Sequence, residues 1–475
     1  MTTQARSGSD SRTVSRSFDA DVIVVGGGIS GLVCAWELQK SGRKVLLLEA
    51  AGRAGGTIGT VRDQGCLFES GPNSTLDTTP LIGRLLAELG IAGERIEAAP
   101  AARNRYILRD GRLIPLPLSP AAFLATPLFS TRAKLRLLRE PFLGRSDESI
   151  EESVADFVRR RIGTEFLDYA INPFVAGVYA GDPEQLSVKA AFPKLHQLEQ
   201  AHGSLILGQL LGARERARSA EKSKQSAAMF AFREGMQTLT DAIARRLDHV
   251  ELDTEVVGVE PGAAGHLVRT GGAAGPREYS SRAVLLSLPA YAAANLSARF
   301  APGASAALAA IPYPPVAVAV SAYRSNPAAH ALDGFGFLVP QCERRQILGT
   351  IFSSTLFGNR VRDGLDLLTT FVGGMRQPAL AQLEEAEIAG LVQAEHAGIL
   401  GAAPRAEFVR VKRWPRAIPQ YTLGHLARIA EIEAAERDVP GLYFCANYRG
   451  GVSIGDCIRA ADATAARAAS FLQRA

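Results

Sequence analysis

The feature that most constrains this chain is a glycine-rich turn between a strand and a helix near its N-terminus. Residues 21–25 form a buried apolar strand, Gly26, Gly28 and Gly31 follow, and residues 32–41 continue as a helix. A second strand over residues 44–48 ends at Glu49. Gly26 permits a tight turn, Gly28 lets the backbone approach a pyrophosphate, and Gly31 lets helix and strand pack closely. This β-α-β unit predicts an α/β fold with a Rossmann-like nucleotide-binding domain.

The same unit suggests how a nucleotide is held. A helix N-terminus offers unpaired amides and the positive end of its dipole to a pyrophosphate. The dipole contributes only about 0.3–1 kcal/mol, so the amide hydrogen bonds supply much of the affinity. Glu49 lies 18 residues after Gly31, where a carboxylate accepts hydrogen bonds from an adenosine ribose. A purely structural glycine turn is the alternative, and the agreement of strand, turn, helix and acid in order and spacing opposes it.

Two further glycine segments favour a longer, extended cofactor. A second glycine pair occurs in residues 53–57, and the sequence Gly-Pro-Asn-Ser follows at 71–74. Near the C-terminus, Gly450 and Gly451 open the final helix, expected over residues 456–472, whose free amides would stabilise negative charge on a reduced flavin. A simple helix cap by Asp456 is the alternative there. Together these segments resemble the superfamily of FAD-containing amine oxidases and phytoene desaturases.

Three longer segments make the resemblance more specific. They are residues 172–187 (NPFVAGVYAGDPEQLS), 418–425 (IPQYTLGH) and 451–458 (GVSIGDCI). With the N-terminal block, they resemble the protoporphyrinogen oxidase family over residues 21–472. The resemblance implies a six-electron oxidation of protoporphyrinogen IX to protoporphyrin IX, with dioxygen reoxidising FAD and giving three hydrogen peroxide.

The resemblance also implies which residues form the site. Those expected to bind FAD, without a covalent link, are Gly26, Gly27, Gly28, Ile29, Ser30, Gly31, Glu49, Ala50, Arg53, Gly56, Thr57, Gly71, Pro72, Asn73, Ser74, Val256, Trp414, Val452, Ser453 and Ile454. Those expected to contact the substrate are Arg105 at a propionate, Leu338, Ile351 and Phe371 around the macrocycle, and Gly177 where a side chain would clash. From the sequence pattern alone, Leu338, Ile351 and Phe371 would be ordinary core residues. Arg105 would be a solvated residue at the edge of a strand. No catalytic proton-transferring side chain and no metal ligand is predicted, because hydride transfer to a flavin is the chemistry of the cofactor.

We expect four parts along the chain. Residues 1–18 form a disordered tail that faintly resembles a transit peptide. The FAD-binding domain takes residues 19–100, 228–290 and 410–475, and a mixed-sheet substrate-binding domain takes 101–118 and 291–409. Residues 119–227 form a helical membrane-associating insertion, in which 214–225 is a polar loop or exposed helix end. Further helices are expected at 149–161, 187–211 and 235–247, and strands at 250–259, 283–288, 316–323, 336–339, 347–352, 367–372 and 442–445.

The insertion suggests a membrane surface as a partner. Residues 119–145 carry five basic side chains against the single acid Glu140, together with nine large apolar ones, and each basic charge near an anionic leaflet contributes about 1 kcal/mol. A solvated basic helix packed on its own domain is the alternative. No run of 18 apolar residues is present, so a transmembrane helix is not expected. Peripheral association with the cytoplasmic membrane of a cytoplasmic protein is the prediction, and the resemblance adds ferrochelatase and a second copy of the chain as candidate partners.

Composition excludes several classes. The charge balance of 53 basic and 48 acidic residues is too even to indicate nucleic-acid binding. Five cysteines without a Cys-x-x-Cys pair argue against a disulfide scaffold and favour a reduced compartment. Three functional alternatives stay open. The first is an amine oxidase, but amine oxidases have two aromatic residues that flank the flavin, and here only Tyr448 is near the C-terminal glycine turn. The others are a coproporphyrinogen III oxidase and a flavin or tetrapyrrole carrier without catalysis.

Overall fold

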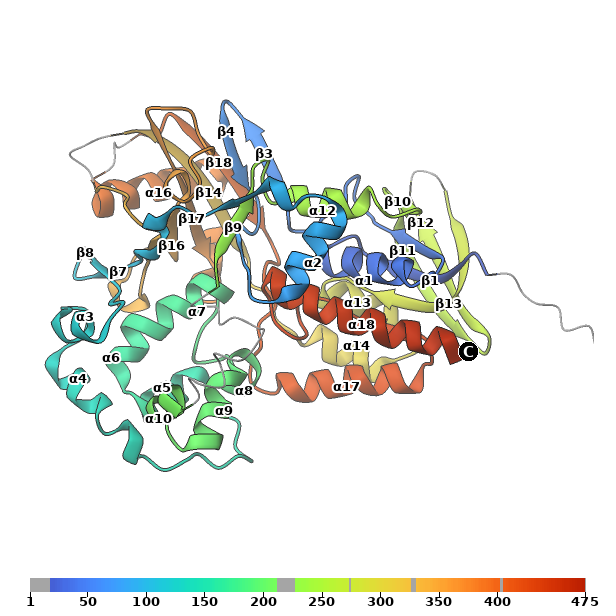
Figure 1. Ribbon diagram of the computed structural model, residues 1–475, viewed down its shortest axis with the longest axis horizontal. Coiled ribbons are helices and arrows are strands. Elements are labelled where there is room, and N and C mark those ends of the chain that lie inside the picture. Colours follow the sequence, from blue (N-terminus) through green and yellow to red (C-terminus); the bar gives the residue numbers. More distant parts are fainter. Residues whose placement is uncertain (1–17, 212–226, 273–274, 326–329, 402–404, 475) are drawn as a thin grey trace, which may run out of the picture.

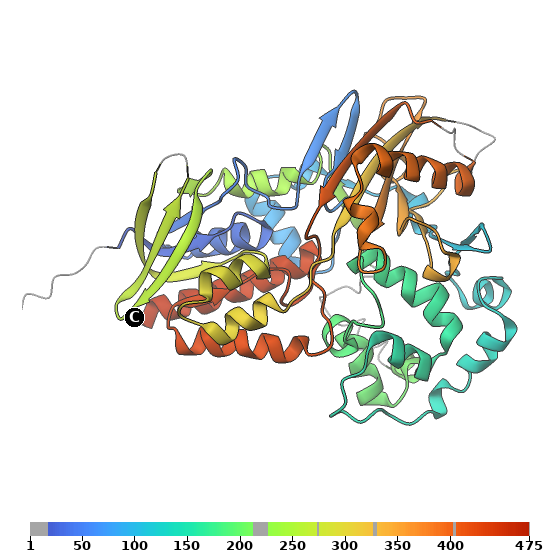
Figure 2. The ribbon, with the colours of Figure 1, turned by 180° about the vertical axis from the view of Figure 1, so that it is seen from behind.

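The structure of the protein is a computed structural model that describes residues 18–211, 227–272, 275–325, 330–401 and 405–474. The expected N-terminal tail up to residue 17 and the polar segment 214–225 lie outside these ranges. Figure 1 shows two sheet-centred units side by side, with a group of helices below the second one. Figure 2 shows the same arrangement from behind.

The first sheet contains the β-α-β unit. Its strand order is β10-β2-β1-β13-β12-β11, with β19 paired to β13. Strands β10, β2, β1, β13 and β19 run parallel to one another, whereas β12 pairs antiparallel with both β13 and β11. The strands are β1 Ala20–Val25, β2 Val45–Leu48, β10 Val250–Glu251, β11 Glu255–Gly262, β12 Gly265–Gly271, β13 Arg277–Leu286 and β19 Leu442–Phe444. The predicted Rossmann-like α/β domain is therefore confirmed.

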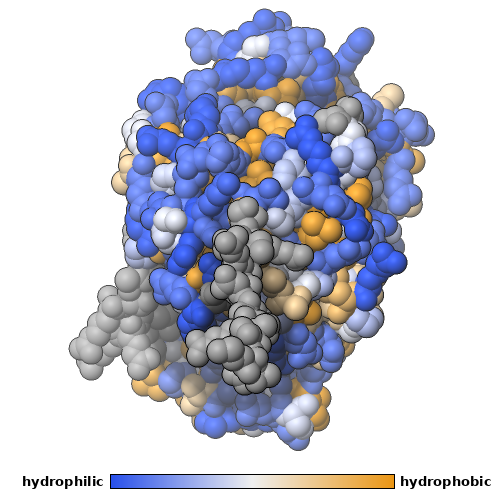
Figure 3. Space-filling view, turned by 90° about the vertical axis from the view of Figure 1, so that its right-hand side faces the viewer, coloured by the Kyte–Doolittle hydropathy of each residue, from blue (hydrophilic) through white to orange (hydrophobic). Residues whose placement is uncertain are grey.

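Helices cover both faces of this sheet because β1 is apolar on both. Val22 and Val24 point into one core and Ile23 and Val25 into the other. The first core is closed by α1 Ile29–Lys40, α2 Pro80–Leu89, α12 Gln237–Ala244 and α18 Ile454–Arg474. The second is closed by α13 Ala290–Ser297, α14 Pro302–Ala309 and α17 His425–Asp438. The end of this unit beside the C-terminus is mainly hydrophilic with scattered apolar residues (Figure 3).

The second sheet is mixed, as expected, with the order β18-β14-β17-β16-β15-β7-β8. Only β7 and β15 pair in parallel. The strands are β7 Tyr106–Arg109, β8 Arg112–Pro115, β14 Val316–Arg324, β15 Gly336–Leu338, β16 Gly349–Phe352, β17 Leu365–Gly373 and β18 Phe408–Trp414, and α16 Glu385–Leu400 packs on one face. Short elements flank the strands: α15 Ser353–Leu356 and the 3-10 turns η5 Gln341–Glu343 and η6 Pro378–Gln382.

Two small sheets and a helical part complete the fold. The small sheets are β3 Thr60–Asp63 with β4 Cys66–Glu69, and β5 Thr75–Leu76, β9 Met229–Phe232 and β6 Arg95–Glu97, beside the turns η1 Ala92–Glu94 and η2 Pro100–Arg103. The helical part consists of α3 Pro120–Ala125, α4 Thr131–Leu137, η3 Glu140–Phe142, α5 Val154–Arg161, α6 Thr164–Phe166, η4 Leu167–Ile171, α7 Asn172–Tyr179, α8 Val188–Ala191, α9 Pro193–His202 and α10 Leu205–Leu211. Among the described residues, no helix combines the length and the hydropathy that crossing a bilayer requires.

Several elements differ from expectation. The strand expected at 250–259 is interrupted, because Asp253 adopts φ of 51° and residues 253 and 254 donate hydrogen bonds to the loop after β2. The helix expected from residue 32 begins at Ile29, and β13 ends at Leu286 instead of continuing to residue 288. Helices α13 and α14 pack on the first sheet, and β18 pairs within the second sheet. Residues 291–309, expected in the substrate-binding domain, thus pack on the first sheet. Residues 410–414, expected in the FAD-binding domain, pair within the second sheet.

Candidate functional site: a nucleotide cradle beside an apolar sheet face

The glycine turn after β1 has the shape that a pyrophosphate requires. A Cβ atom on Gly26 would lie 2.3 Å from the Ser287 carbonyl oxygen, and one on Gly31 would lie 2.0 Å from the Gly26 carbonyl oxygen, so both positions exclude a side chain. In front of Gly28 the space is open, with no atom of the described chain within 4 Å of an added Cβ. Gly28 is the N-cap of α1 and provides no side-chain cap. The helix amides at Ile29 and beyond therefore face room for an anion.

Glu49 lies at the edge of this turn. Its Oε2 accepts a 2.6 Å hydrogen bond from the Gly27 amide, and its Oε1 accepts one of 2.8 Å from Ala51. Ala50, between them, is exposed. A carboxylate oxygen has more than one acceptor position, so these bonds leave Glu49 able to accept ribose hydroxyls. Val256 lies near this loop, two residues after Thr254, whose amide donates to the Glu49 carbonyl.

The second glycine pair folds back onto the first turn. Gly55 donates a 2.7 Å hydrogen bond to the Gly27 carbonyl, and a Cβ on Gly56 would lie 3.2 Å from the Gly28 Cα. Arg53 holds this loop, because its guanidinium donates to the carbonyls of Ala54, Gly56 and Ile58. The structure thus assigns Arg53 a role in shaping the loop, which the sequence did not reveal.

The segment 71–74 is anchored beside Thr57. A Cβ on Gly71 would lie 2.0 Å from the Thr57 carbonyl oxygen, so only glycine fits. Trp414 of β18 donates a 2.7 Å hydrogen bond from Nε1 to the Ser70 carbonyl, and its ring packs against a core cluster that includes Val318 of the second sheet. The Trp414 contact connects this glycine segment to the second sheet. Asn73 donates a 3.3 Å hydrogen bond to the Gly71 carbonyl.

The C-terminal turn is organised by a buried tyrosine. The Tyr421 hydroxyl donates to the Asn447 carbonyl at 2.7 Å and accepts from the Gly451 amide at 3.0 Å. Burial raises the pKa of Tyr421, so the hydroxyl stays protonated and can make both bonds. Asp456 and Ser453 cap α18 reciprocally: Ser453 Oγ donates to Asp456 Oδ2 at 2.6 Å and accepts from the Asp456 amide at 3.2 Å. The expected cap by Asp456 is therefore corrected: Ser453 caps the helix, which begins at Ile454, and the Asp456 carboxylate holds the Ser453 hydroxyl in place.

Three of the expected substrate residues share one face of the second sheet. Leu338, Gly349 and Phe371 lie on one rung across β15, β16 and β17, and Ile351 lies two residues further along β16 on the same face. Leu338, Ile351 and Phe371 are half-buried, whereas their neighbours in sequence are buried. This face is therefore an apolar surface that is still available for contact. Gly349, which sequence reasoning missed, lies between Leu338 and Phe371, and a Cβ there would lie 2.6 Å from the Phe337 carbonyl oxygen and 3.0 Å from Leu338 Cδ2.

Helix α7 faces this surface through Gly177. A Cβ on Gly177 would lie 2.6 Å from Leu338 Cδ2, as expected for a position that excludes a side chain. Both ends of α7 are tied to the chain after β17. Ala180 accepts a hydrogen bond from the Met375 amide at 2.8 Å, and Asn172 Oδ1 accepts one from Arg376 at 2.7 Å.

Arg105 lies immediately before β7. The parallel pairing of β7 with β15 brings it level with Gly336, which pairs with Ile351. Its guanidinium stacks on Phe335 with 5.4 Å between Cζ and the ring centroid. Within the described ranges, no carboxylate forms an ion pair with it. Arg105 is thus a cation available to an anionic ligand at the edge of the apolar face.

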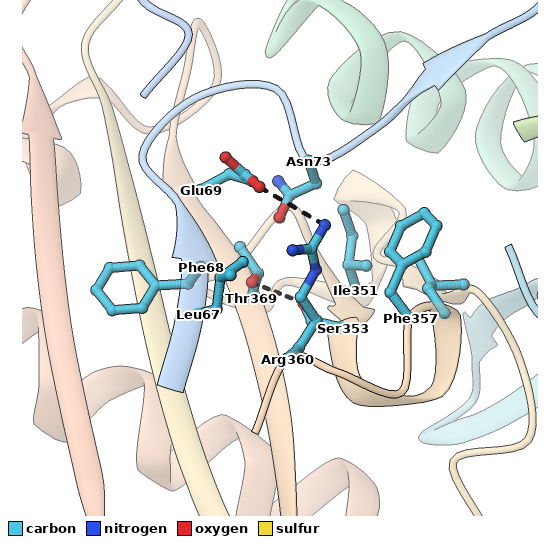
Figure 4. A pocket seen from close by; sticks show the side chains of 10 residues that line it. Leu67, Phe68, Glu69, Asn73, Ile351, Ser353, Phe357, Arg360 and Thr369 are labelled. Carbon is cyan, nitrogen blue, oxygen red and sulfur yellow. Dashed lines mark hydrogen bonds and ion pairs between the residues drawn. The ribbon is translucent and has the colours of Figure 1, made fainter. Parts of the chain in front are cut away.

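A small cavity lies between the glycine segment and the apolar face (Figure 4). Its lining includes Asn73 and Ile351, together with the buried residues Glu69 and Arg360. Arg360 is separated from Glu69 by 291 positions in the sequence, and nothing in the local pattern marked either residue.

These features fit FAD. The open space at the N-terminus of α1, the ribose acceptor at Glu49 and the second glycine pair against Gly28 can hold an adenine dinucleotide. The segment 71–74 lies next to the apolar sheet face, because Asn73 and Ile351 line one cavity.

Comparisons with known proteins agree with this geometry. The sequence profile of the family described as "Flavin containing amine oxidoreductase" matches residues 29–469. Protoporphyrinogen oxidase 2 of Arabidopsis thaliana is 32% identical, over 95% of this chain and 94% of the relative. The Bacillus subtilis coproporphyrinogen III oxidase is 28% identical, over 95% and 98%. A crystal structure from Exiguobacterium sp. 255-15 is similar with a TM-score of 0.79 at 22% identity, covering 94% and 98% of the two chains.

The matched residues 29–469 include helix α1, Glu49 and the second glycine pair of the cradle as well as the apolar sheet face, so these features belong to one flavoprotein architecture. The chain is an FAD-dependent oxidoreductase that belongs to the flavin-containing amine oxidoreductases and, within them, to the protoporphyrinogen oxidase family.

Proposed function

We propose that the protein oxidises protoporphyrinogen IX to protoporphyrin IX, with dioxygen as the final acceptor. The observation that carries this proposal is the half-buried apolar face formed by Leu338, Ile351 and Phe371. Next to it lies Arg105, which forms no ion pair within the described part of the chain. A porphyrinogen is a broad apolar disc with carboxylates on one edge, which matches an apolar face with a cation at its side.

Each residue then has a role. Leu338 and Phe371 contact the disc, Ile351 extends this contact along β16, and Gly177, which has no side chain, lets Leu338 keep its place on the face. Arg105 binds a propionate, which orients the disc. Glu49 accepts the ribose hydroxyls, and the amides of α1 bind the pyrophosphate.

FAD, when bound, accepts hydride equivalents from the substrate and transfers the electrons to dioxygen. Six electrons and six protons leave the porphyrinogen, and three dioxygen become three hydrogen peroxide. The side chains bind and orient the disc and exclude water from it.

Coproporphyrinogen III is the second candidate substrate, because a coproporphyrinogen III oxidase is among the similar proteins. Its four propionates would require more cations than Arg105 alone. Aerobic turnover with each porphyrinogen, following porphyrin fluorescence and peroxide together, tests the proposal. We expect faster oxidation of protoporphyrinogen with three peroxide per porphyrin. A clear preference for coproporphyrinogen, or porphyrin formed without peroxide, would overturn it.

We further propose that part of the helical segment touches an anionic membrane surface. Leu124, Leu135, Leu138 and Phe142 are exposed, with Phe142 at 88%. Leu128 and Phe129, two of the nine large apolar residues of segment 119–145, are only 0% and 5% exposed, because they pack with Phe166 within the domain.

The charge supports the same surface. Glu140 is fully buried next to Arg161, so its charge does not oppose a leaflet, and the neighbouring Arg132, Arg136, Arg139 and Arg145 are exposed. Co-sedimentation with anionic vesicles at low salt tests this, with neutral vesicles as the control. Leu138→Ser with Phe142→Ser is expected to abolish it, and equal binding of this variant would contradict the proposed surface. Ferrochelatase and a second copy of the chain stay predictions.

A further inference from the structure

The cavity between the glycine segment and the apolar face contains an unusual buried arginine. Arg360 is 3% exposed, and its Nη1 and Nη2 atoms have no hydrogen-bond partner in the described part of the chain. Its nearest carboxylate is Glu69, with 3.7 Å between Nη2 and Oε1, which is too long for a hydrogen bond. Its other close contact is the Phe357 ring, 5.1 Å from Cζ to the centroid.

Glu69 is held by other groups. It accepts a 2.6 Å hydrogen bond from the Thr60 hydroxyl and one of 3.0 Å from the Met236 amide. Burial raises the pKa of this carboxyl, and the Arg360 charge acts in the opposite direction. Arg360 and Glu69 therefore form only a loose contact, and the Nη1 and Nη2 groups of Arg360 remain free to donate hydrogen bonds.

The position of Arg360 is fixed by its backbone. Its carbonyl accepts a 2.7 Å hydrogen bond from the Leu67 amide of β4, and its own amide donates to the Phe357 carbonyl at 3.2 Å. The guanidinium cannot lose its proton in a protein. Because a buried charge without hydrogen bonds disfavours folding, a stabilising role does not account for this side chain.

The free N–H donors of Arg360 lie beside segment 71–74, which is assigned to FAD. Figure 4 shows the end of Arg360 next to Asn73 and Ile351, with Glu69 further away on the side of Asn73. The cavity has about 10 Å³ of room, which approaches the space of one water molecule. Ser353 also lines it and supplies a further polar group.

We propose that Arg360 is a positioning residue of the cofactor site. Through a water molecule in the cavity, its guanidinium holds and polarises the Asn73 amide, and through this contact it raises the midpoint potential of the bound FAD. A charge acts over a longer range in a buried, low-dielectric site than in water. The inference rests on the assignment of segment 71–74 to FAD and does not depend on which porphyrinogen is the substrate.

The test measures the midpoint potential and visible spectrum of bound FAD without any porphyrinogen. Arg360→Met is expected to make the potential more negative, and Arg360→Lys to keep it close to that of the parent protein. Glu69→Gln is expected to move it in the opposite direction, because it removes the compensating charge. The matched control is Arg62→Met, since Arg62 pairs with Glu234 on the surface at 58% exposure and is expected to leave the potential unchanged.

A double-mutant cycle separates positioning from a general charge effect. With Asn73→Ala as background, the shift caused by Arg360→Met should fall to less than half. An unchanged potential and spectrum in Arg360→Met, or a full shift in the Asn73→Ala background, would overturn the proposal, even if the melting temperature falls. If Arg360→Met does not fold, the midpoint potential of Glu69→Gln decides. A potential equal to that of the parent protein would then overturn the proposal. Failure of the proposed substrate appears separately, as a parent flavin that porphyrinogen does not reduce.

Discussion

Replacing Gly177 by alanine should separate stability from function. Gly177 is inside α7 and exposed, so alanine should stabilise the helix by up to about 1 kcal/mol. The new Cβ would lie 2.6 Å from Leu338 Cδ2. Because that atom is the end of a flexible side chain, Leu338 can rotate away at little cost in stability. It then no longer occupies its place on the apolar face.

The loss should appear in substrate oxidation alone. Displacing one apolar group from a binding surface costs about 1–3 kcal/mol, which corresponds to roughly a 10- to 200-fold fall in kcat/KM. Porphyrin fluorescence gives kcat and KM, and thermal unfolding gives Tm. We expect Tm to stay equal or rise while kcat/KM falls.

Gly83→Ala is the matched control. Gly83 is also exposed inside a helix, α2, and an added Cβ has no atom of the described chain within 4 Å. It should give the same rise in Tm with unchanged kinetics. If Gly177→Ala shows the kinetics of the parent, or melts earlier with kinetics that follow the loss of folded protein, the reasoning about Gly177 and Leu338 is refuted.

Three other predictions follow from the site. Arg105→Ala should raise KM for the porphyrinogen about tenfold or more, since a charge-assisted hydrogen bond contributes about 1.5–3 kcal/mol, and leave the Kd for FAD unchanged; an unchanged KM would remove Arg105 from the site. Glu49→Gln should weaken FAD binding about tenfold by titration of the apoprotein, because the charged acceptor for the ribose is lost while the bond from Gly27 can persist; equal affinity would contradict the ribose assignment. Burial lowers the pKa of His396 to about 3, so between this value and 6.5 the unfolded chain binds a proton that the folded chain does not. The free energy of unfolding should therefore fall by about 1.4 kcal/mol per pH unit on acidification below 6.5, and His396→Asn should remove this share of the slope in denaturant titrations; an unchanged slope would contradict it.

The nucleotide cradle could be predicted because its signals are local. The strand, the Gly26–Gly31 turn, the helix and Glu49 lie within 30 residues, and the close approach of Gly31 to the Gly26 carbonyl arises within the turn itself. The contribution of Arg53 was less accessible, because the sequence does not show whether a guanidinium faces a cofactor or the carbonyls of its own loop.

The substrate face depends on pairing between distant strands. Periodicity identifies Leu338 and Phe371 as apolar strand residues, but only the register of β15, β16 and β17 brings them onto one rung with Gly349 between them. The burial of Leu128 in its own domain is non-local in the same way. So is the approach of Arg360 to Glu69.

The most direct test of the account is anaerobic mixing of the purified protein with protoporphyrinogen and, separately, with coproporphyrinogen. The account predicts that the protein is yellow, and that protoporphyrinogen bleaches the flavin absorption faster than coproporphyrinogen does, with colour returning when air is admitted. A colourless protein that does not take up added FAD, or a flavin that neither porphyrinogen bleaches, would contradict it.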